Sequence, residues 1–414
     1  MLHAILSQRA SERPDKPAII QGQRRVTYGE LDLWVLRMAS FLVRHGLQKG
    51  DRIGIMSRNS PEYVAAYLGI QSAGGIAVDI SYQASSPEIM TIANHCHIAA
   101  LIVENSRIDE IADAVRKTPS IRTIIGMERR ARGFSAVRKK IPAEIEYVVL
   151  GDIIGGLYGT QALPDTAAND VAAIIYTSDV ARKPRGVMLS HENFVANARS
   201  IIDHLKINDR DRIMVVLPFG HSFGKSLLTT HLTAGGTLVL ENNFANPDTV
   251  FDKMVEEEVT GFAGVPSTFA AMLSQSNLTN YRFPQLRYVI QAGGAIPPQH
   301  AHKIAELLPH ASVHILYGQT EATAHLTCLE LPDLLQRPGS LGRPLAGVEI
   351  DVVQDEAGGS REGEIAARGK NVMIGYWNDP GETSRVLKDG RLHTGDIGRM
   401  DADGYLYSSA AGAK

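Results

Sequence analysis

The sequence predicts an α/β protein with two stacked βα subdomains, each with a mainly parallel sheet, followed by a small β-rich subdomain. Three observations favour this fold class. Helix-type and strand-type hydrophobic patterns alternate through the first half, and a second alternating series begins at residue 171. From about Arg337, glycines punctuate short alternating segments. We place the subdomains at residues 1–167, 168–334 and 335–414.

The first subdomain carries clear local signals. Thr27-Tyr28-Gly29-Glu30 has capping-box spacing and predicts the start of an amphipathic helix, which Gly46 ends. Ser60 followed by Pro61 predicts a second helix start. Short apolar runs predict strands at 53–56, 99–103 and 123–125.

The second series predicts a strand at its start, residues 171–176, and a helix capped near Ser190. Further strands are expected at 213–217, 237–240, 261–265, 288–292 and 313–316. In the β-rich subdomain, alternation predicts strands at 348–353 and 363–367. The tail at 408–414 is small and unpatterned, which indicates a frayed or artificially ended terminus.

Composition excludes several classes of protein. The 414 residues are 44% hydrophobic, and 42 lysines and arginines face 45 aspartates and glutamates, so the net charge of −3 gives no general attraction to nucleic acid. The N-terminus is too polar for a secretion signal, and no run reaches the ~18 apolar residues of a membrane span. We therefore expect a cytoplasmic protein. The basic stretch 129–140 is interpreted as a solvated loop or as an anion patch.

The cysteines and histidines do not predict a zinc site. Cys96 and Cys328 are too few for a disulfide framework, which fits a reducing compartment. They are far apart in the sequence and lack neighbouring ligands, so no zinc-type spacing is present. His314 and His325 are expected to be structural.

The first segment suited to chemistry follows the strand at 171–176. Thr177 and Ser178 supply hydroxyls, and Arg182, Lys183 and Arg185 supply cations. A loop at the carboxyl end of a parallel strand is where α/β sheets bind ligands, and these groups suit phosphate. The GxxxxGK[ST] pattern is absent. A basic turn without a ligand is the alternative.

Two further segments suit a nucleotide. In Tyr317-Gly318-Gln319-Thr320-Glu321 the ring can cover a base, the glycine permits close backbone approach, and the hydroxyl and carboxylate suit Mg²⁺. In His393-Thr394-Gly395-Asp396 the carboxylate can accept hydrogen bonds from two ribose hydroxyls. An ordinary strand-to-helix turn and an Asx turn are the respective alternatives.

In this order the segments resemble the adenylate-forming acyl- and aryl-CoA ligase superfamily, which includes acyl-CoA synthetases, luciferases and peptide-synthetase adenylation domains. The resemblance covers essentially the whole chain as the large N-terminal domain. It also rests on residues 26–31 (VTYGEL), 49–53 (KGDRI), 264–267 (GVPS), 293–295 (GGA), 339–344 (GSLGRP) and 375–377 (GYW).

The resemblance implies a two-step reaction. A carboxylic acid attacks the α-phosphate of Mg²⁺-ATP, which gives an acyl-adenylate and pyrophosphate. The thiol of coenzyme A or of a phosphopantetheine acyl carrier protein then displaces AMP. In full, the activity implied is ATP-dependent activation of a carboxylic acid and transfer of its acyl group to a thiol.

The resemblance also implies site residues. The expected catalytic residues are Thr320 at the α-phosphate, Glu321, Arg185 and His221. The other implied roles are the phosphate loop (Thr177, Ser178, Lys183, Arg185), the adenine slot (Gly293, Gly294, Ala295, Tyr317, Gly318), the ribose hydroxyls (Asp396), Mg²⁺ (Glu321, Thr177) and the acyl pocket (His221, Phe223, Gly294).

Two features depart from the superfamily pattern. The phosphate loop normally reads T-S-G-T-T-G-x-P-K-G, but Asp179, Val180, Ala181 and Arg182 replace its G-T-T-G core. At ~4 Å and an effective dielectric of ~20, a like-charge pair costs about 4 kcal/mol, so weakened ATP binding or slow adenylation is expected. The superfamily's C-terminal lysine domain is also absent from this sequence, which indicates part of a longer enzyme or a naturally truncated relative.

Alternatives remain open at this point. Besides the ligase, the altered loop favours a degenerate, catalytically weak or inactive binding module that keeps an acyl or AMP pocket, and an unrelated α/β enzyme is a third reading. Residues 219–222 (FGHS) lack the aspartate that commonly holds an α-ammonium, which favours a fatty or aryl acid over a primary amino acid. A proline-like acid remains open, His221 is either a pocket wall or structural, and the oligomeric state is not indicated.

Overall fold

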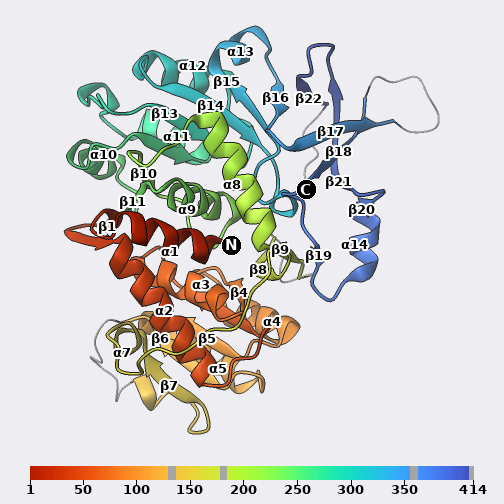
Figure 1. The fold of residues 1–414 in the computed structure, drawn as a ribbon. Coiled ribbons are helices and arrows are strands. Elements are labelled where there is room, and N and C mark those ends of the chain that lie inside the picture. The colour runs from red at the N-terminus through yellow and green to blue at the C-terminus, as the bar shows by residue number, and fades with distance from the viewer. Residues whose placement is uncertain (129–136, 178–183, 355–361, 410–414) are drawn as a thin grey trace. The chain divides into compact units, whose positions relative to one another are not determined.

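The computed structural model describes residues 1–128, 137–177, 184–354 and 362–409. The chain forms two compact units (Figure 1). Unit 1 comprises residues 1–191 and 374–380, and unit 2 comprises residues 192–373 and 381–414. This division differs from the three segments expected from the sequence, and that three-part division stays a prediction.

The sheet of unit 1 is mainly parallel, as predicted. β4 runs parallel to β8 and β3, and β3, β5, β6 and β7 continue the parallel series, whereas β9 and β19 are antiparallel additions. The strand order is β19 (Gly375–Tyr376), β9 (Gly186–Ser190), β8 (Val171–Tyr176), β4 (Ile76–Asp79), β3 (Arg52–Met56), β5 (Ala100–Val103), β6 (Thr123–Gly126) and β7 (Glu146–Val149). A hairpin of β1 (Pro17–Gln21) and β2 (Arg24–Thr27) precedes them in the chain.

The helices of unit 1 begin where the local signals predicted. The Thr27 hydroxyl accepts a hydrogen bond from Glu30 N (3.2 Å), and the Glu30 carboxylate accepts one from Thr27 N (2.9 Å), which completes the capping box. Ser60 caps the next helix by accepting from Tyr63 N (3.0 Å). The helical segments are α1 (Leu2–Glu12), α2 (Tyr28–Arg44), α3 (Pro61–Ser72), α4 (Ser86–Cys96), η1 (Asn105–Arg107), α5 (Ile108–Arg116) and α7 (Leu150–Ile154).

β8 lies in a different series from the one expected. The sequence predicted that it opens the second βα series, but it pairs in parallel with β4 of the first sheet. A buried apolar run indicates that a strand is covered on both faces, yet it does not indicate which strand lies beside it. The segment after β8 also differs, because it leads into the antiparallel strand β9 before α8 (His191–Leu205) begins.

The sheet of unit 2 changes character along its width. β11, β10, β12, β13 and β14 are parallel, and every following pair is antiparallel, so the β-rich segment extends the same sheet. The order is β11 (Thr237–Leu240), β10 (Arg212–Val215), β12 (Gly261–Gly264), β13 (Tyr288–Gln291), β14 (Ser312–Tyr317), β15 (Thr327–Glu330), β16 (Ser340–Pro344), β22 (Leu406–Ser408), β21 (Arg391–Met400), β18 (Gly363–Gly369) and β17 (Val348–Val353); β20 (Leu387–Lys388) pairs with β21.

Helices of unit 2 alternate with these strands, as the second βα series predicted. They are α8, almost all of it in this unit, α9 (Ser222–Ala234), α10 (Pro247–Glu256), α11 (Pro266–Ser274), η2 (Leu278–Asn280), α12 (Pro298–Leu307), η3 (Thr320–Ala322), α13 (Leu331–Gln336) and α14 (Pro380–Val386). Across the ranges that the structure describes, no helix combines the length and apolar character that crossing a bilayer requires. Residues 129–136 of the basic stretch lie outside those ranges.

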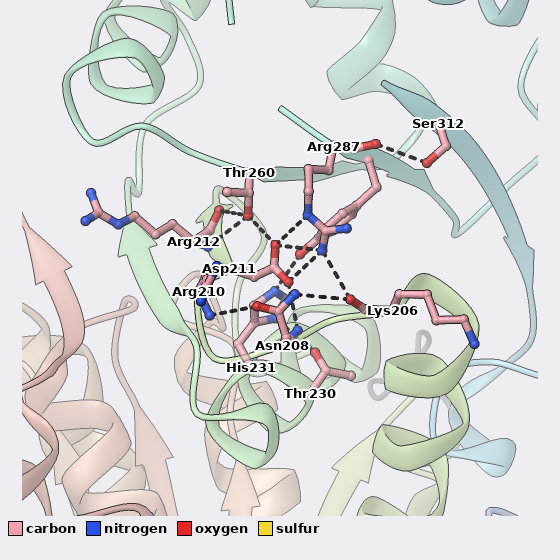
Figure 2. A network of polar contacts seen from close by, with 11 residues as sticks. Lys206, Asn208, Arg210, Asp211, Arg212, Thr230, His231, Thr260, Arg287 and Ser312 are labelled. Atoms are coloured by element: carbon pink, nitrogen blue, oxygen red, sulfur yellow. Dashed lines mark hydrogen bonds and ion pairs between the residues drawn. The ribbon is translucent and has the colours of Figure 1, made fainter. Parts of the chain in front are cut away.

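A buried carboxylate ties together the amino ends of the parallel strands in unit 2 (Figure 2). Asp211 directly precedes β10, and its carboxylate accepts hydrogen bonds from Arg287 Nε (3.0 Å) and Nη2 (2.6 Å), Thr260 Oγ1 (2.7 Å) and Asn208 N (2.8 Å). Thr260 and Arg287 directly precede β12 and β13. A structural hydrogen-bond network therefore occupies the amino ends of these strands. In α/β sheets, ligands bind at the carboxyl ends of the strands.

Candidate functional site

Tyr317 and Asp396, chosen from separate sequence motifs, touch each other in the structure. Tyr317 is the last residue of β14, and its hydroxyl donates a 2.7 Å hydrogen bond to Asp396 Oδ2. Burial, and then the Asp396 carboxylate, raise the pKa of Tyr317 far above its usual value. The phenol therefore stays protonated and acts as the donor at any physiological pH.

A β-bulge presents the Asp396 side chain. Ala366 of β18 pairs with His393, but Glu364 pairs with Ile397. An advance of two residues along β18 therefore corresponds to four residues along β21. The intervening backbone has a left-handed residue at Gly395 (φ +79°). Bulges redirect a side chain out of the ladder, which explains how an acid inside a strand reaches Tyr317.

Buried asparagines hold the loop between β14 and β15. Asn371 Nδ2 donates to the carbonyl oxygens of Ala322 (3.1 Å) and His325 (3.3 Å), and Asn197 Nδ2 also donates to His325 O (3.0 Å). A side chain at Gly318 would overlap the carbonyl oxygen of Ala324, so only glycine fits there. Sequence reasoning missed both asparagines, because a lone asparagine far from a motif carries no local signal.

Thr320 and Glu321 form part of η3 within this loop. The Thr320 hydroxyl donates to Ser222 Oγ (3.2 Å), and the backbone oxygen of Glu321 accepts a hydrogen bond from Met373 N (2.8 Å). Both side chains are half-buried. These hydrogen bonds hold the backbone that carries the Thr320 hydroxyl and the Glu321 carboxylate. Oxygen donors of these kinds are the ligands that Mg²⁺ prefers.

Gly293, Gly294 and Ala295 form an exposed turn directly after β13, the strand next to β14. Gly293 has φ +82° and Gly294 has φ +154°, conformations that L side chains rarely adopt. Gln291, which is fully buried, donates from Nε2 to Gly294 O (2.8 Å) and holds the turn in place. The turn and Tyr317 therefore lie at the carboxyl ends of adjacent parallel strands.

The residues expected at the acyl pocket separate into exposed and buried positions. His221 is exposed and caps α9 without a side-chain hydrogen bond to the helix. Phe223 is buried and contacts His325 edge-on, with ring centroids 5.1 Å apart. Burial lowers the pKa of His325 to about 3, so this ring is neutral, and its two buried nitrogens have no hydrogen-bond partner among the described residues.

The described residues of the predicted phosphate loop lie in unit 1. Thr177 N donates to Arg185 O (3.2 Å), which extends the β8–β9 pairing by one step beyond Tyr176 and Gly186. Thr177 and Arg185 thus stand opposite each other where the two strands end. Ser178, Lys183 and the substituted positions 179–182 lie outside the described residues.

The chain is similar to known proteins in both sequence and fold. A family model described as "AMP-binding enzyme" matches residues 6–377. The chain is 29% identical to an indoleacetate–CoA ligase of Aromatoleum aromaticum (97% of this chain, 76% of the relative) and 26% identical to a long-chain-fatty-acid–CoA ligase of Bacillus subtilis (98% and 76%). It superimposes with a TM-score of 0.87 on the inhibitor-bound N-terminal domain of FACL13 from Mycobacterium tuberculosis, at 25% identity over 99% of both chains.

Proposed function

Because this chain belongs to the AMP-binding enzyme family, we propose that its Tyr317–Asp396 pair binds the nucleoside of ATP during acid activation. The chain is the large domain of an acid–thiol ligase of the acyl-CoA synthetase type. Such a ligase activates a carboxylic acid with ATP and transfers the acyl group to coenzyme A. The proposal concerns which residues of this chain do that work.

The hydrogen bond between Tyr317 and Asp396 is the observation that carries the proposal. Tyr317 is half-buried, and we propose that its ring stacks on the base, an interaction contributing about 1–3 kcal/mol in nucleic-acid complexes. The hydroxyl fixes Asp396, whose carboxylate can then accept hydrogen bonds from ribose hydroxyls. The exposed Gly293–Gly294 backbone on the neighbouring strand supplies a flat edge for the base.

Thr320, Glu321 and Arg185 are proposed to act on the phosphates. The Thr320 hydroxyl, oriented by Ser222, contacts the α-phosphate, and the Arg185 cation stabilises the charge that develops there. The carboxylate of Glu321 fits Mg²⁺, which would neutralise phosphate charge when bound, and the Thr177 hydroxyl offers an oxygen donor of the same kind in unit 1. Ser178 and Lys183 complete the proposed phosphate loop.

The acid is proposed to be a fatty or aryl carboxylic acid, with His221, Phe223 and Gly294 at its pocket. The buried Phe223 ring supplies an apolar surface, and the neighbouring His325 carries no charge, which supports an apolar substrate. The two relatives are named as ligases of a long-chain fatty acid and of indoleacetate, which supports the same classes. The thiol acceptor is proposed to be coenzyme A or, in its place, a carrier-protein thiol. A cytoplasmic location is also proposed, and the two free, buried cysteines support it.

A second candidate function rests on the phosphate loop. Asp179, Val180, Ala181 and Arg182 replace the glycines and threonines that normally contact the triphosphate. A chain with this change and an intact Tyr317–Asp396 pair would bind AMP or an acyl group without turning over ATP. This binding module is the alternative to the ligase.

Calorimetric titration with ATP and AMP, combined with pyrophosphate exchange, tests both functions. The acid panel contains a long-chain fatty acid, an arylacetic acid, a benzoic acid and proline. We expect AMP binding, and exchange that depends on a fatty or aryl acid. AMP binding without exchange from any acid would favour the binding module, and no nucleotide binding at millimolar concentration would contradict the proposal.

A further inference from the structure

Three potential metal ligands from distant parts of the sequence meet in unit 2. They are His204 near the end of α8, His314 on β14 and Cys328 on β15. One donor atom from each lies within 4.8 Å of the other two. Cys328 Sγ is 3.8 Å from His314 Nδ1, and the two imidazole rings contact edge-on with centroids 5.6 Å apart.

The register of the β14–β15 hairpin explains how two of the ligands meet. His314 lies opposite Glu330, and Leu316 lies opposite Cys328. Directly opposite residues of an antiparallel pair point to the same face, so His314 and Cys328 are diagonal neighbours on one face of the hairpin. His204 reaches the same face from α8. None of this is visible in the sequence, where the spacings resemble no zinc motif.

The three donor atoms differ in their partners: His314 Nδ1 and Cys328 Sγ share one long contact of 3.8 Å, which a bound ion would replace. His204 Nε2 is buried without a hydrogen-bond partner among the described residues, and the Glu330 carboxylate oxygen Oε1 is 3.6 Å away. His314 Nε2 lies 3.0 Å from Ser312 Oγ. A proton on that nitrogen, donated to the serine, leaves a lone pair on Nδ1, which is the usual outer-shell arrangement of a metal-binding histidine.

We propose that His204 Nε2, His314 Nδ1 and Cys328 Sγ bind one Zn²⁺ ion, with Glu330 or a water as fourth ligand. Zinc takes nitrogen at ~2.0–2.1 Å and sulfur at ~2.3 Å in a tetrahedron, which separates ligand atoms by roughly 3.3–3.6 Å. His314 Nδ1 and Cys328 Sγ are 3.8 Å apart and His204 Nε2 and Glu330 Oε1 are 3.6 Å apart, which is close to these values. The three donor atoms together lie within 4.8 Å of one another, so side-chain shifts of about 1 Å would complete the tetrahedron. On binding, the Cys328 thiol releases its proton to solvent and coordinates as thiolate.

The ion would link α8 to the β14–β15 hairpin, which carries Tyr317 of the candidate nucleotide site. His314 is three residues before Tyr317 on the same strand, and Cys328 pairs with Leu316, the residue next to Tyr317. Coordination would therefore restrain the base of the loop that presents Tyr317, Thr320 and Glu321. The inferred role is structural, because the ion lies behind the loop within the layer between helix and sheet.

Cobalt binding to the reduced, metal-free chain tests the inference. Co²⁺ replaces Zn²⁺ in such sites and gives a sulfur-to-cobalt charge-transfer absorption when a thiolate is a ligand. We expect this band to saturate at one equivalent, to disappear when Zn²⁺ is added, and to be accompanied by a higher melting temperature with Zn²⁺. These readouts do not depend on nucleotide binding, so their failure is distinguishable from failure of the proposed function.

Three variants define the site. Cys328→Ser should abolish the band, and His204→Ala, at a partly exposed helix position, should weaken Co²⁺ binding at least about tenfold while the chain stays folded. Cys96→Ser is the matched control, because Cys96 is the other buried cysteine and contacts Tyr176 in unit 1, so the band should persist. No band at one equivalent, or a band that survives both Cys328→Ser and His204→Ala, would overturn the inference.

Discussion

Replacing Tyr317 with phenylalanine tests the candidate site at a single atom. The variant keeps the ring on which a base would stack and removes only the hydroxyl that donates to Asp396 Oδ2 at 2.7 Å. We expect Tyr317→Phe to bind AMP more weakly because the Asp396 carboxylate is then no longer held in position for the ribose.

The size of the effect follows from the bond that is lost. A hydrogen bond to a charged group contributes about 1.5–3 kcal/mol to stability. If all of that free energy were lost from AMP binding, the dissociation constant would rise by at most roughly 150-fold. The variant loses the bond in the free protein as well, so only the part that orients Asp396 is lost from binding. We take that part as about 1 kcal/mol, which is roughly a fivefold weaker affinity.

Isothermal titration with AMP measures the change, and Tyr405→Phe is the matched control. The Tyr405 hydroxyl donates to Asp333 Oδ2, also at 2.7 Å, in the same unit but outside the candidate site. Both variants should lose a similar amount of unfolding free energy, whereas only Tyr317→Phe should lose AMP affinity. An unchanged AMP affinity in Tyr317→Phe, or an equal loss in Tyr405→Phe, would refute the reasoning.

Four other outcomes are expected. Gly318→Ala places a methyl group on a backbone carbonyl, so its unfolding free energy in urea should fall by about 1–3 kcal/mol or more; a neutral effect would contradict the packing argument. Asp211→Ala removes the buried acceptor of Arg287 and Thr260 and should cost about 1.5–3 kcal/mol in the same assay; an unchanged unfolding free energy would contradict this role. Reverting residues 179–182 to Gly-Thr-Thr-Gly should tighten ATP binding roughly tenfold or more, and unchanged affinity would refute our account of that loop. His325 has a usual pKa of 6.5 that burial lowers to about 3, so the unfolded chain binds the proton first and stability should fall as pH drops from 6.5 towards 3; His325→Leu should lose less stability over that interval, measured by urea unfolding at several pH values.

Features with local causes could be predicted from the sequence. The start of α2 depends on Thr27 and Glu30, which are three residues apart, and the capping box formed as expected. The strands of the second series lie close to their expected positions for the same reason, because a run of apolar residues predicts a strand from its own residues alone. The neighbour of β8 could not be predicted, because pairing with β4 depends on contacts about a hundred residues away.

The candidate site divides in the same way. Motif resemblance selected Tyr317 and Asp396, but their contact depends on a bulge in β21 that the sequence around Gly395 does not reveal. The roles assigned to these residues stay predictions. His204, His314 and Cys328 meet only because a helix covers one face of a hairpin, and their spacing in the sequence hides that arrangement.

The return of β19 to the first sheet has a consequence for how the chain is made. β9 pairs with β8 on one side and ends at Ser190, but β19, its neighbour on the other side, begins only at Gly375. At roughly 5–20 residues per second on a ribosome, β9 waits ~10–40 s for that partner. During that interval unit 1 has an open sheet edge, which is a template for wrong pairing. Nascent chains of this protein should accordingly be most vulnerable to aggregation, and most dependent on chaperones, while unit 2 is being synthesised.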